Sequence, residues 1–179
     1  MFAKLNVFEI RKDALKAIKN DASRWSFIFI YYIIPICIAL LIHYINYELN
    51  TELFGNLIGG ISLFAGLLFS IIFVVSNNLN SRKIQYQSQN EEDKRYIENY
   101  RNFSNNIVYL ISYTVVKSII IIVLLILADA YFDYLNETAN LLIRIIWDLI
   151  VFLLYHFLLY IIIILKEMYV MQYEDINKK

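Results

Sequence analysis

Four ionisable side chains fall inside long apolar stretches of the sequence, where a charge is expensive to keep. They are Lys117, Arg144, Asp148 and Asp129. A charge at the centre of a membrane helix costs about 2.5–3.5 kcal/mol on insertion scales, so such residues are expected to find partners. We expect these four to form one intramembrane charge network. Its chemistry would be a proton or ion pathway, or a switch that breaks on opening; the alternative is a purely structural link between helices.

The spacing of these residues suggests particular pairs. Lys117 and Asp148 lie about 20 Å and about 11 Å from the same end of their apolar stretches at 1.5 Å per residue, and a lysine stem can close much of that difference. Arg144 and Asp148 are i, i+4 neighbours and can pair within one helix. His43 and His156 fall in different stretches, so we predict hydrogen bonds between helices instead of a metal site, with pH sensing as the alternative.

A stripe of small residues runs through the second apolar stretch, which holds every glycine of the chain. We call it the small-residue stripe, and it consists of Gly55, Gly59, Ser62, Gly66 and Ser70. Small residues let helix backbones approach closely in lipid, where hydrophobicity no longer drives association. The stripe predicts either packing inside one subunit, or an interface between subunits or a pore-lining helix.

An aromatic stripe precedes the third apolar stretch. Tyr96, Tyr100 and Phe103 fall at i, i+4 and i+7, which places them on one face of a helix. This face is either a docking surface for a cytoplasmic partner or a packing surface beneath the bundle.

The elements that must carry these residues follow from the length and composition of the apolar runs. Hydrophobic residues make up 60 % of the 179 residues and charged residues 18 %, so the chain needs lipid as its solvent. About 20 apolar residues cross a bilayer as a helix. Four runs meet that length: 26–47, 53–76, 107–130 and 141–165. They do not alternate as barrel strands do. The sequence therefore predicts an all-α protein with a bundle of four transmembrane helices.

Basic residues lie on one side of the four spans. Of the 16 Lys and Arg residues, Lys117 and Arg144 fall within spans. The others precede the first span, lie between the second and third, or follow the fourth: Lys4, Arg11, Lys12, Lys16, Lys19, Arg24, Arg82, Lys83, Lys94, Arg95, Arg101, Lys166, Lys178 and Lys179. The positive-inside rule then predicts a multi-pass inner-membrane protein with both termini in the cytoplasm.

Three segments are expected outside the membrane on that side. Residues 1–25 contain an amphipathic helix with Val7, Ile10, Ala14 and Ile18 on one face, which can lie in the headgroup layer. The alternative is that its basic residues are ordinary positive charges flanking the first span. Residues 77–106 are predicted to begin polar and then form a helix that continues into the third span. The tail, residues 166–179, is predicted to fray.

Several functional classes receive no support from the sequence. No P-loop, dinucleotide fingerprint, H-E-x-x-H or G-x-S-x-G motif occurs, so we expect no catalytic residues and no enzyme activity. The single cysteine, Cys37, excludes a multi-cysteine metal site, and we expect neither a metal nor another cofactor. A formal net charge of zero gives no support to direct nucleic-acid binding.

The size, the four spans, the basic N-terminal helix and the Ile/Asn/Lys/Tyr-rich composition resemble small membrane proteins of bacterial antiphage systems. Examples are the membrane subunit of Kiwa and the accessory membrane proteins of type VI CRISPR systems. The resemblance covers architecture and carries no site residue over. It implies a homo-oligomeric inner-membrane effector or sensor that acts with a cytoplasmic partner, with pore formation by several subunits as one mode of action. The alternative is a structural or transporter-accessory subunit that conducts nothing itself.

Overall fold

The computed structural model describes residues 7–19, 24–45, 51–85, 90–132 and 137–177, and nearly all of them are helical. The elements are α1 (Val7–Lys19), α2 (Arg24–Ile28), the π-helix η2 (Phe29–Ile33), α3 (Ile34–Ile45), α4 (Thr51–Gln85), α5 (Glu91–Phe132) and α6 (Glu137–Asn177). The described residues contain no strand, so the predicted all-α class is confirmed.

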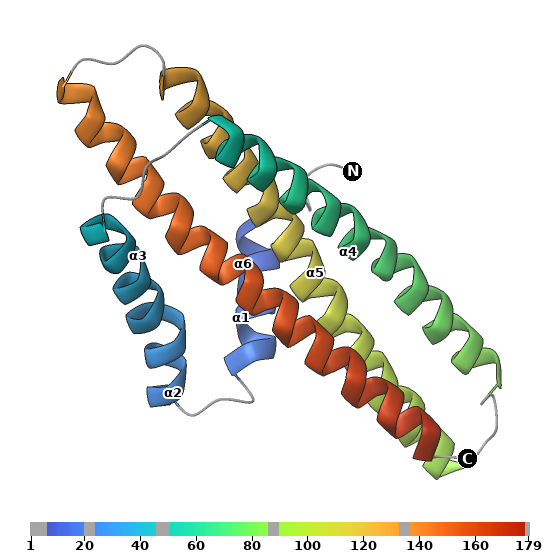
Figure 1. The fold of residues 1–179 in the computed structure, drawn as a ribbon. Helices are drawn as coiled ribbons and strands as arrows, with labels where there is room; N and C mark the ends of the chain where they lie inside the picture. The colour runs from blue at the N-terminus through green and yellow to red at the C-terminus, as the bar shows by residue number, and fades with distance from the viewer. Residues whose placement is uncertain (1–6, 20–23, 46–50, 86–89, 133–136, 178–179) are drawn as a thin grey trace.

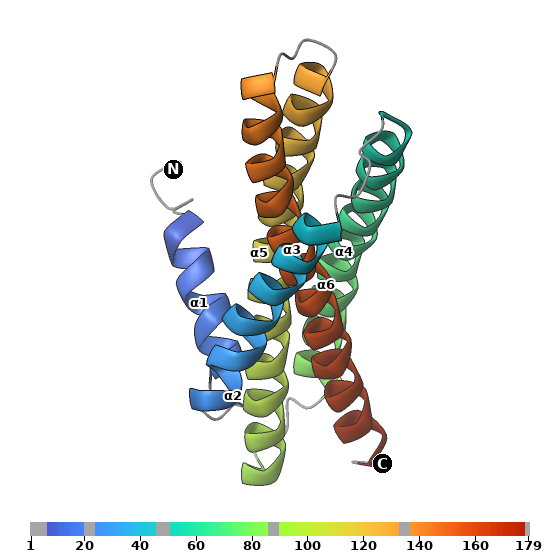
Figure 2. The same ribbon diagram turned by 60° about the vertical axis from the view of Figure 1, so that its left-hand side comes forward.

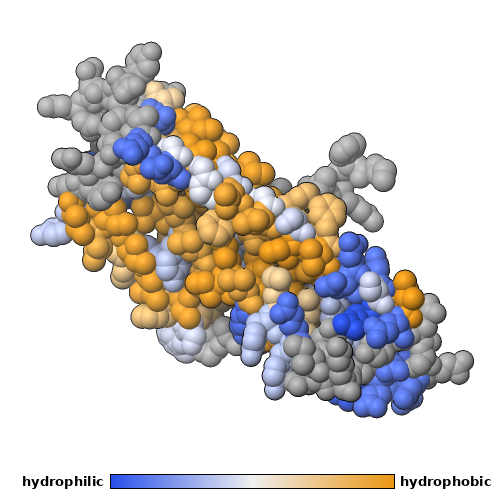
Figure 3. Space-filling model, turned by 45° about the vertical axis from the view of Figure 1, so that its right-hand side comes forward, coloured by the Kyte–Doolittle hydropathy of each residue, from blue (hydrophilic) through white to orange (hydrophobic). Residues whose placement is uncertain are grey.

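Four stretches of the described residues are long and apolar enough to cross a membrane: Trp25–Ile45, Glu52–Gln85, Glu91–Ala130 and Arg144–Tyr173. Their mean hydropathy lies between 2.4 and 2.6. Figure 3 shows apolar surface over much of the bundle and hydrophilic surface gathered at one end, where α4 ends, α5 begins and α6 ends. We call this the basic end, because Arg82, Lys83, Lys94 and Arg95 lie there. The chain is therefore a multi-pass membrane protein.

The antiparallel helices α5 and α6 form the centre of the molecule. Helix α4 packs on α5, and α3 packs on α6, so the first and second spans lie on the flanks of the central pair (Figure 1). One apolar cluster towards the basic end includes Ile107, Leu110 and Ile164. A second, nearer the other end, joins α4, α5 and α6 through residues such as Phe54 and Phe157. The bundle is therefore built around α5 and α6.

The amphipathic helix predicted near the N-terminus is α1. Its apolar face is turned inward: Ala14 is fully buried, Ile18 is buried, and Ile10 is half-buried. Ala14 and Ile18 share a cluster with Tyr100 and Ile107 of α5. Figure 2 shows α1 beside the central pair, with α4 on the opposite side of α5. Helix α1 thus packs its apolar face on α5. This packing accounts for the apolar face without placing the helix in the headgroup layer.

Two predicted boundaries differ from the structure. Helix α4 continues to Gln85, past the expected end at 76, because Leu79 extends the α5-facing side of the helix. Helix α6 continues to Asn177, so the expectation that the tail frays from 166 is wrong for the described residues. Met168 and Met171 pack against the apolar cluster and extend the inward face of α6. The predicted continuation of the helix around Tyr96 into the third span is confirmed by α5.

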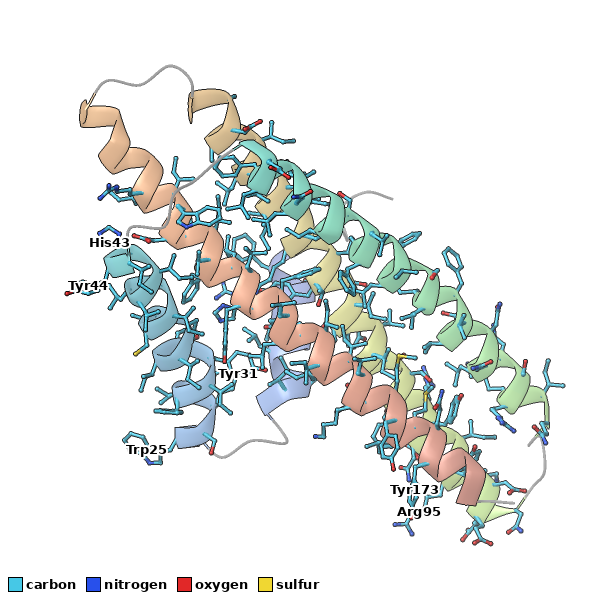
Figure 4. The ribbon with its side chains drawn as sticks, in the orientation of Figure 1. Trp25, Tyr31, His43, Tyr44, Arg95 and Tyr173 are labelled. Atoms are coloured by element: carbon cyan, nitrogen blue, oxygen red, sulfur yellow. The ribbon has the colours of Figure 1, made fainter. Side chains whose placement is uncertain are left out.

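The first span contains an irregular turn and two exposed aromatic ends. The π-helix η2 ends directly before Ile34 and Pro35, and proline removes one backbone donor from the helix ladder. Trp25 at one end and Tyr44 at the other are 82 % and 88 % exposed, and both point away from the bundle (Figure 4). Amphipathic rings at both ends of a span are typical of membrane interfaces.

Candidate functional site

Lys117 is the buried cation of the bundle interior. Its side chain projects from the middle of α5 and is 8 % exposed. Its Nζ atom lies 4.9 Å from the ring centroid of Tyr113 and 4.4 Å from that of Tyr160 on α6. Ammonium groups are attracted to aromatic ring faces within about 6 Å, with a gain of about 2 kcal/mol when the pair is desolvated. The two rings therefore offset part of the cost of burying this charge.

The hydroxyl groups next to Lys117 have other partners. Thr114 donates to the Leu110 carbonyl at 2.7 Å, and Ser118 donates to the Val115 carbonyl at 2.7 Å. Such bonds to a preceding turn are common for Ser and Thr in helices. No carboxylate among the described residues forms an ion pair with Lys117. Lys117 is thus held by aromatic rings alone within the described part of the chain.

His156 joins the first span to α6. Its Nε2 atom lies 2.9 Å from the Tyr31 carbonyl oxygen, and its Nδ1 atom lies 2.9 Å from the Phe152 carbonyl oxygen. The Tyr31 carbonyl is four residues before Pro35, so its normal helical donor is missing. With a hydrogen on Nε2, His156 supplies that donor from the neighbouring helix. The predicted interhelical hydrogen bond is confirmed for this histidine.

Tyr31 connects His156 to Lys117. Its ring centroid is 6.1 Å from that of His156 and 6.3 Å from that of Tyr160. Figure 4 shows the Tyr31 side chain projecting from the first span between the helices. The Tyr31 hydroxyl is buried and has no hydrogen-bond partner. We call the residues Tyr31, Tyr113, Lys117, His156 and Tyr160 the tyrosine–lysine cluster.

A second polar contact lies near the far end of the first span. His43 Nδ1 is 3.0 Å from Asp148 Oδ2, which links α3 to α6 (Figure 4). The side chains are 44 % and 31 % exposed, so the pair lies at the bundle surface. This confirms an interhelical role for His43. Asp148 could not be recognised as its partner from the sequence, because the relative depth of two spans depends on how they pack.

The predicted charge network is not formed by the described residues. Lys117 contacts Tyr160, and Asp148 precedes Tyr160 by twelve positions, about 18 Å along α6. The expected pairing of Lys117 with Asp148 is therefore wrong. Asp148 pairs with His43. Arg144 is exposed and forms no ion pair with Asp148. Asp129 has a buried Oδ1 atom without a hydrogen-bond partner among the described residues. The four charges occupy separate places in the bundle.

The small-residue stripe faces away from the rest of the chain. A Cβ atom added to Gly55, Gly59 or Gly66 would meet nothing within 4 Å, and Ser62 and Ser70 are exposed. Helix α4 uses a different face for α5, formed by Phe54, Ile61, Leu68 and Val75 at seven-residue intervals. Among the described residues, nothing packs on the stripe, so packing inside one subunit does not account for it.

The aromatic stripe of α5 is used for internal packing. Tyr100 is 5 % exposed, and Tyr96 and Phe103 are half-buried against the same apolar cluster. The assignment of these three rings to partner docking is corrected accordingly. An i, i+4, i+7 pattern shows that one face of a helix is apolar, and it cannot show what covers that face.

Comparison of the chain with protein-family models, curated proteins and solved structures finds no match. Among the described residues, no group of three or more His, Cys, Asp or Glu side chains is arranged to hold a metal ion. The arguments about function therefore rest on the geometry of the bundle and on the sequence.

Proposed function

We propose that the chain is a homo-oligomeric membrane effector or sensor whose copies associate through α4. The observation that supports this most directly is the open small-residue stripe. Three glycines along one face of a span leave its backbone accessible, and nothing in the described part of the chain covers that face. Close backbone approach is how spans associate in lipid, so a second copy is the occupant that fits.

The low burial of α4 supports the same proposal. Buried residues make up 17 % of the most apolar stretch of α4, against 39 % for α5. A helix that packs mainly on one neighbour leaves much of its circumference to lipid or to another protein. Pairing of this face with itself gives a dimer, and a ring of several copies around a pore would require a second contact surface.

The cellular setting is proposed from the sequence. The basic residues on one side of the spans favour a bacterial inner membrane with both termini in the cytoplasm. The helical extension at the basic end, with exposed charged residues such as Glu92, Arg95 and Arg101, then faces the cytoplasm and is available to a protein partner. The architectural resemblance to antiphage membrane proteins supports a role in defence alongside such a partner.

A matched pair of substitutions tests the association. Gly59→Leu places a large side chain on the small-residue stripe, and Gly60→Leu places the same side chain about 100° away around the helix. Both positions are open within the chain, so neither substitution creates a clash in a single copy. We expect Gly59→Leu to shift the protein in nanodiscs from oligomer to monomer and Gly60→Leu to leave the oligomer intact. A wild-type monomer, or equal behaviour of the two variants, would contradict the proposal.

The alternative is a structural or transporter-accessory subunit, and the exposed charged extension at the basic end favours it as a second candidate. Ion flux through the purified protein in liposomes separates the two. Flux that Gly59→Leu abolishes supports an effector that conducts as an oligomer. An intact oligomer without flux, which co-purifies with a soluble protein in a fixed ratio, supports the subunit instead.

A further inference from the structure

The tyrosine–lysine cluster holds a buried cation. Lys117 lies between the rings of Tyr113 and Tyr160 and is 8 % exposed. The two ring faces offset only part of the cost of taking an ammonium group out of water, so a neutralising group is expected nearby.

The described residues provide no such group. No carboxylate of the described residues forms an ion pair with Lys117. Asp129 lies on α5 about 18 Å from Lys117, and Glu167 lies on α6 about 10 Å from Tyr160, by their positions along the helices. A buried cation without a carboxylate is rare in membrane proteins, where buried charges pair or mark a functional site.

A free hydrogen-bond donor completes the arrangement. The buried Tyr31 hydroxyl has no hydrogen-bond partner among the described residues, and its ring packs against Tyr160, the nearer of the two rings at the Lys117 ammonium. Buried hydroxyl groups normally make hydrogen bonds, and an unmade bond costs about 1–3 kcal/mol. A ligand that accepts a hydrogen bond and carries negative charge would satisfy both Tyr31 and Lys117.

The depth of the cluster indicates where that ligand comes from. Tyr31 follows the interfacial residue Trp25 by six positions, about 9 Å along the first span. The Lys117 side chain bends back over Tyr113, one turn nearer the basic end. The flanking residues Phe29 and Tyr32 of the first span are exposed to the membrane. The membrane surface at the basic end is therefore the nearest source of an anion, and a lipid phosphate drawn below that surface can meet a lysine that extends towards it.

We propose that the tyrosine–lysine cluster binds the phosphate of an anionic lipid from the leaflet at the basic end. Lys117 provides the charge, Tyr31 donates a hydrogen bond, and the exposed rings of Phe29 and Tyr32 contact the acyl chains. Every residue of this site belongs to one copy, so the site does not depend on the proposed oligomer. Lipid bound here would hold the first span against the central pair.

Lipid-dependent thermal unfolding of the full chain tests the proposal. We expect phosphatidylglycerol in phosphatidylcholine nanodiscs to raise the Tm of the wild type. Lys117→Met keeps the length of the side chain and should weaken the apparent phosphatidylglycerol affinity about tenfold, as expected for a lost charge-assisted hydrogen bond. Tyr31→Phe keeps the ring and removes the hydroxyl, and it should weaken the apparent phosphatidylglycerol affinity about threefold.

Controls separate this site from a general charge effect and from a free anion. Lys83→Met removes an exposed positive charge of α4 at the basic end and should leave the affinity unchanged. The proposal is overturned if phosphatidylglycerol stabilises Lys117→Met as strongly as the wild type. It is also overturned if Lys117→Met loses the same stability in both lipids, which would make the lysine purely structural. Full stabilisation by inorganic phosphate in phosphatidylcholine alone would overturn the lipid source and assign the site to a free anion.

Discussion

The central helices and the flanking spans of this protein meet lipid in different ways. Buried residues make up 39 % of the most apolar stretch of α5 and 33 % of that of α6, but 17 % for α4 and 11 % for the first span. The central pair carries the buried Lys117, His156 and Thr114, whereas the flanks carry exposed glycines and aromatic rings. The centre is therefore specified by contacts within one chain, and the flanks leave surface for lipid or another copy.

The largest expected effect on stability comes from truncating a phenylalanine in the central pair and comparing it with the same truncation on a flanking span. Phe157→Ala removes a ring that is 1 % exposed in the apolar cluster shared by α4, α5 and α6. It should lower the free energy of unfolding by about 3 kcal/mol. Phe64→Ala on α4 removes a ring that is 45 % exposed and should cost less than about 1 kcal/mol. Denaturation in mixed micelles measures both free energies of unfolding. Equal decreases for the two variants would contradict the difference between centre and flank.

The contact of His156 with Tyr31 should show the next largest effect. His156→Leu leaves the Tyr31 carbonyl without its donor, and a buried unpaired carbonyl costs about 1–3 kcal/mol. Pro35→Ala returns the backbone N–H that would normally bond to this carbonyl. We therefore expect His156→Leu to cost clearly less in the Pro35→Ala background. A loss that is the same in both backgrounds would show that His156 does not serve the carbonyl that Pro35 leaves open.

The smallest effect is expected at the surface pair of the first span and α6. A double-mutant cycle with His43→Ala and Asp148→Ala should give a coupling energy of about 0.6 kcal/mol, the average for hydrogen bonds between membrane helices. The value should lie below the His156 effect, because the His43–Asp148 pair is partly exposed. A cycle with Arg144→Ala in place of His43→Ala is the control and should show no coupling to Asp148.

The sequence predicted the helices well because their main determinant is local. An apolar run of sufficient length predicts a span whatever its neighbours are, and the i, i+4, i+7 pattern of α5 showed that its helix continues out of the membrane. The ends of α4 and α6 were missed, because their extra turns are held by contacts with α5 that a single helix does not reveal.

The candidate site was predicted less well, because it depends on the relative depth of the spans. Lys117 was recognised as unusual from its position, and the structure supplies Tyr113 and Tyr160 in place of Asp148 as its neighbours. Tyr113 lies four residues before Lys117, so this one contact had a signal in the sequence. Tyr31 had none, since only the packing of the first span on α6 brings it to the cluster.

The central claim is that the open face of α4 belongs to a second copy, and disulfide trapping tests it directly. Cys37 is the single cysteine, so a Cys37→Ser background carries no other thiol. Ser62→Cys then places one thiol on the small-residue stripe, and Gly60→Cys places one elsewhere on the same helix. Under oxidation in native membranes we predict a covalent dimer with Ser62→Cys and monomer with Gly60→Cys. A monomer with Ser62→Cys, or equal trapping at both positions, would contradict the account.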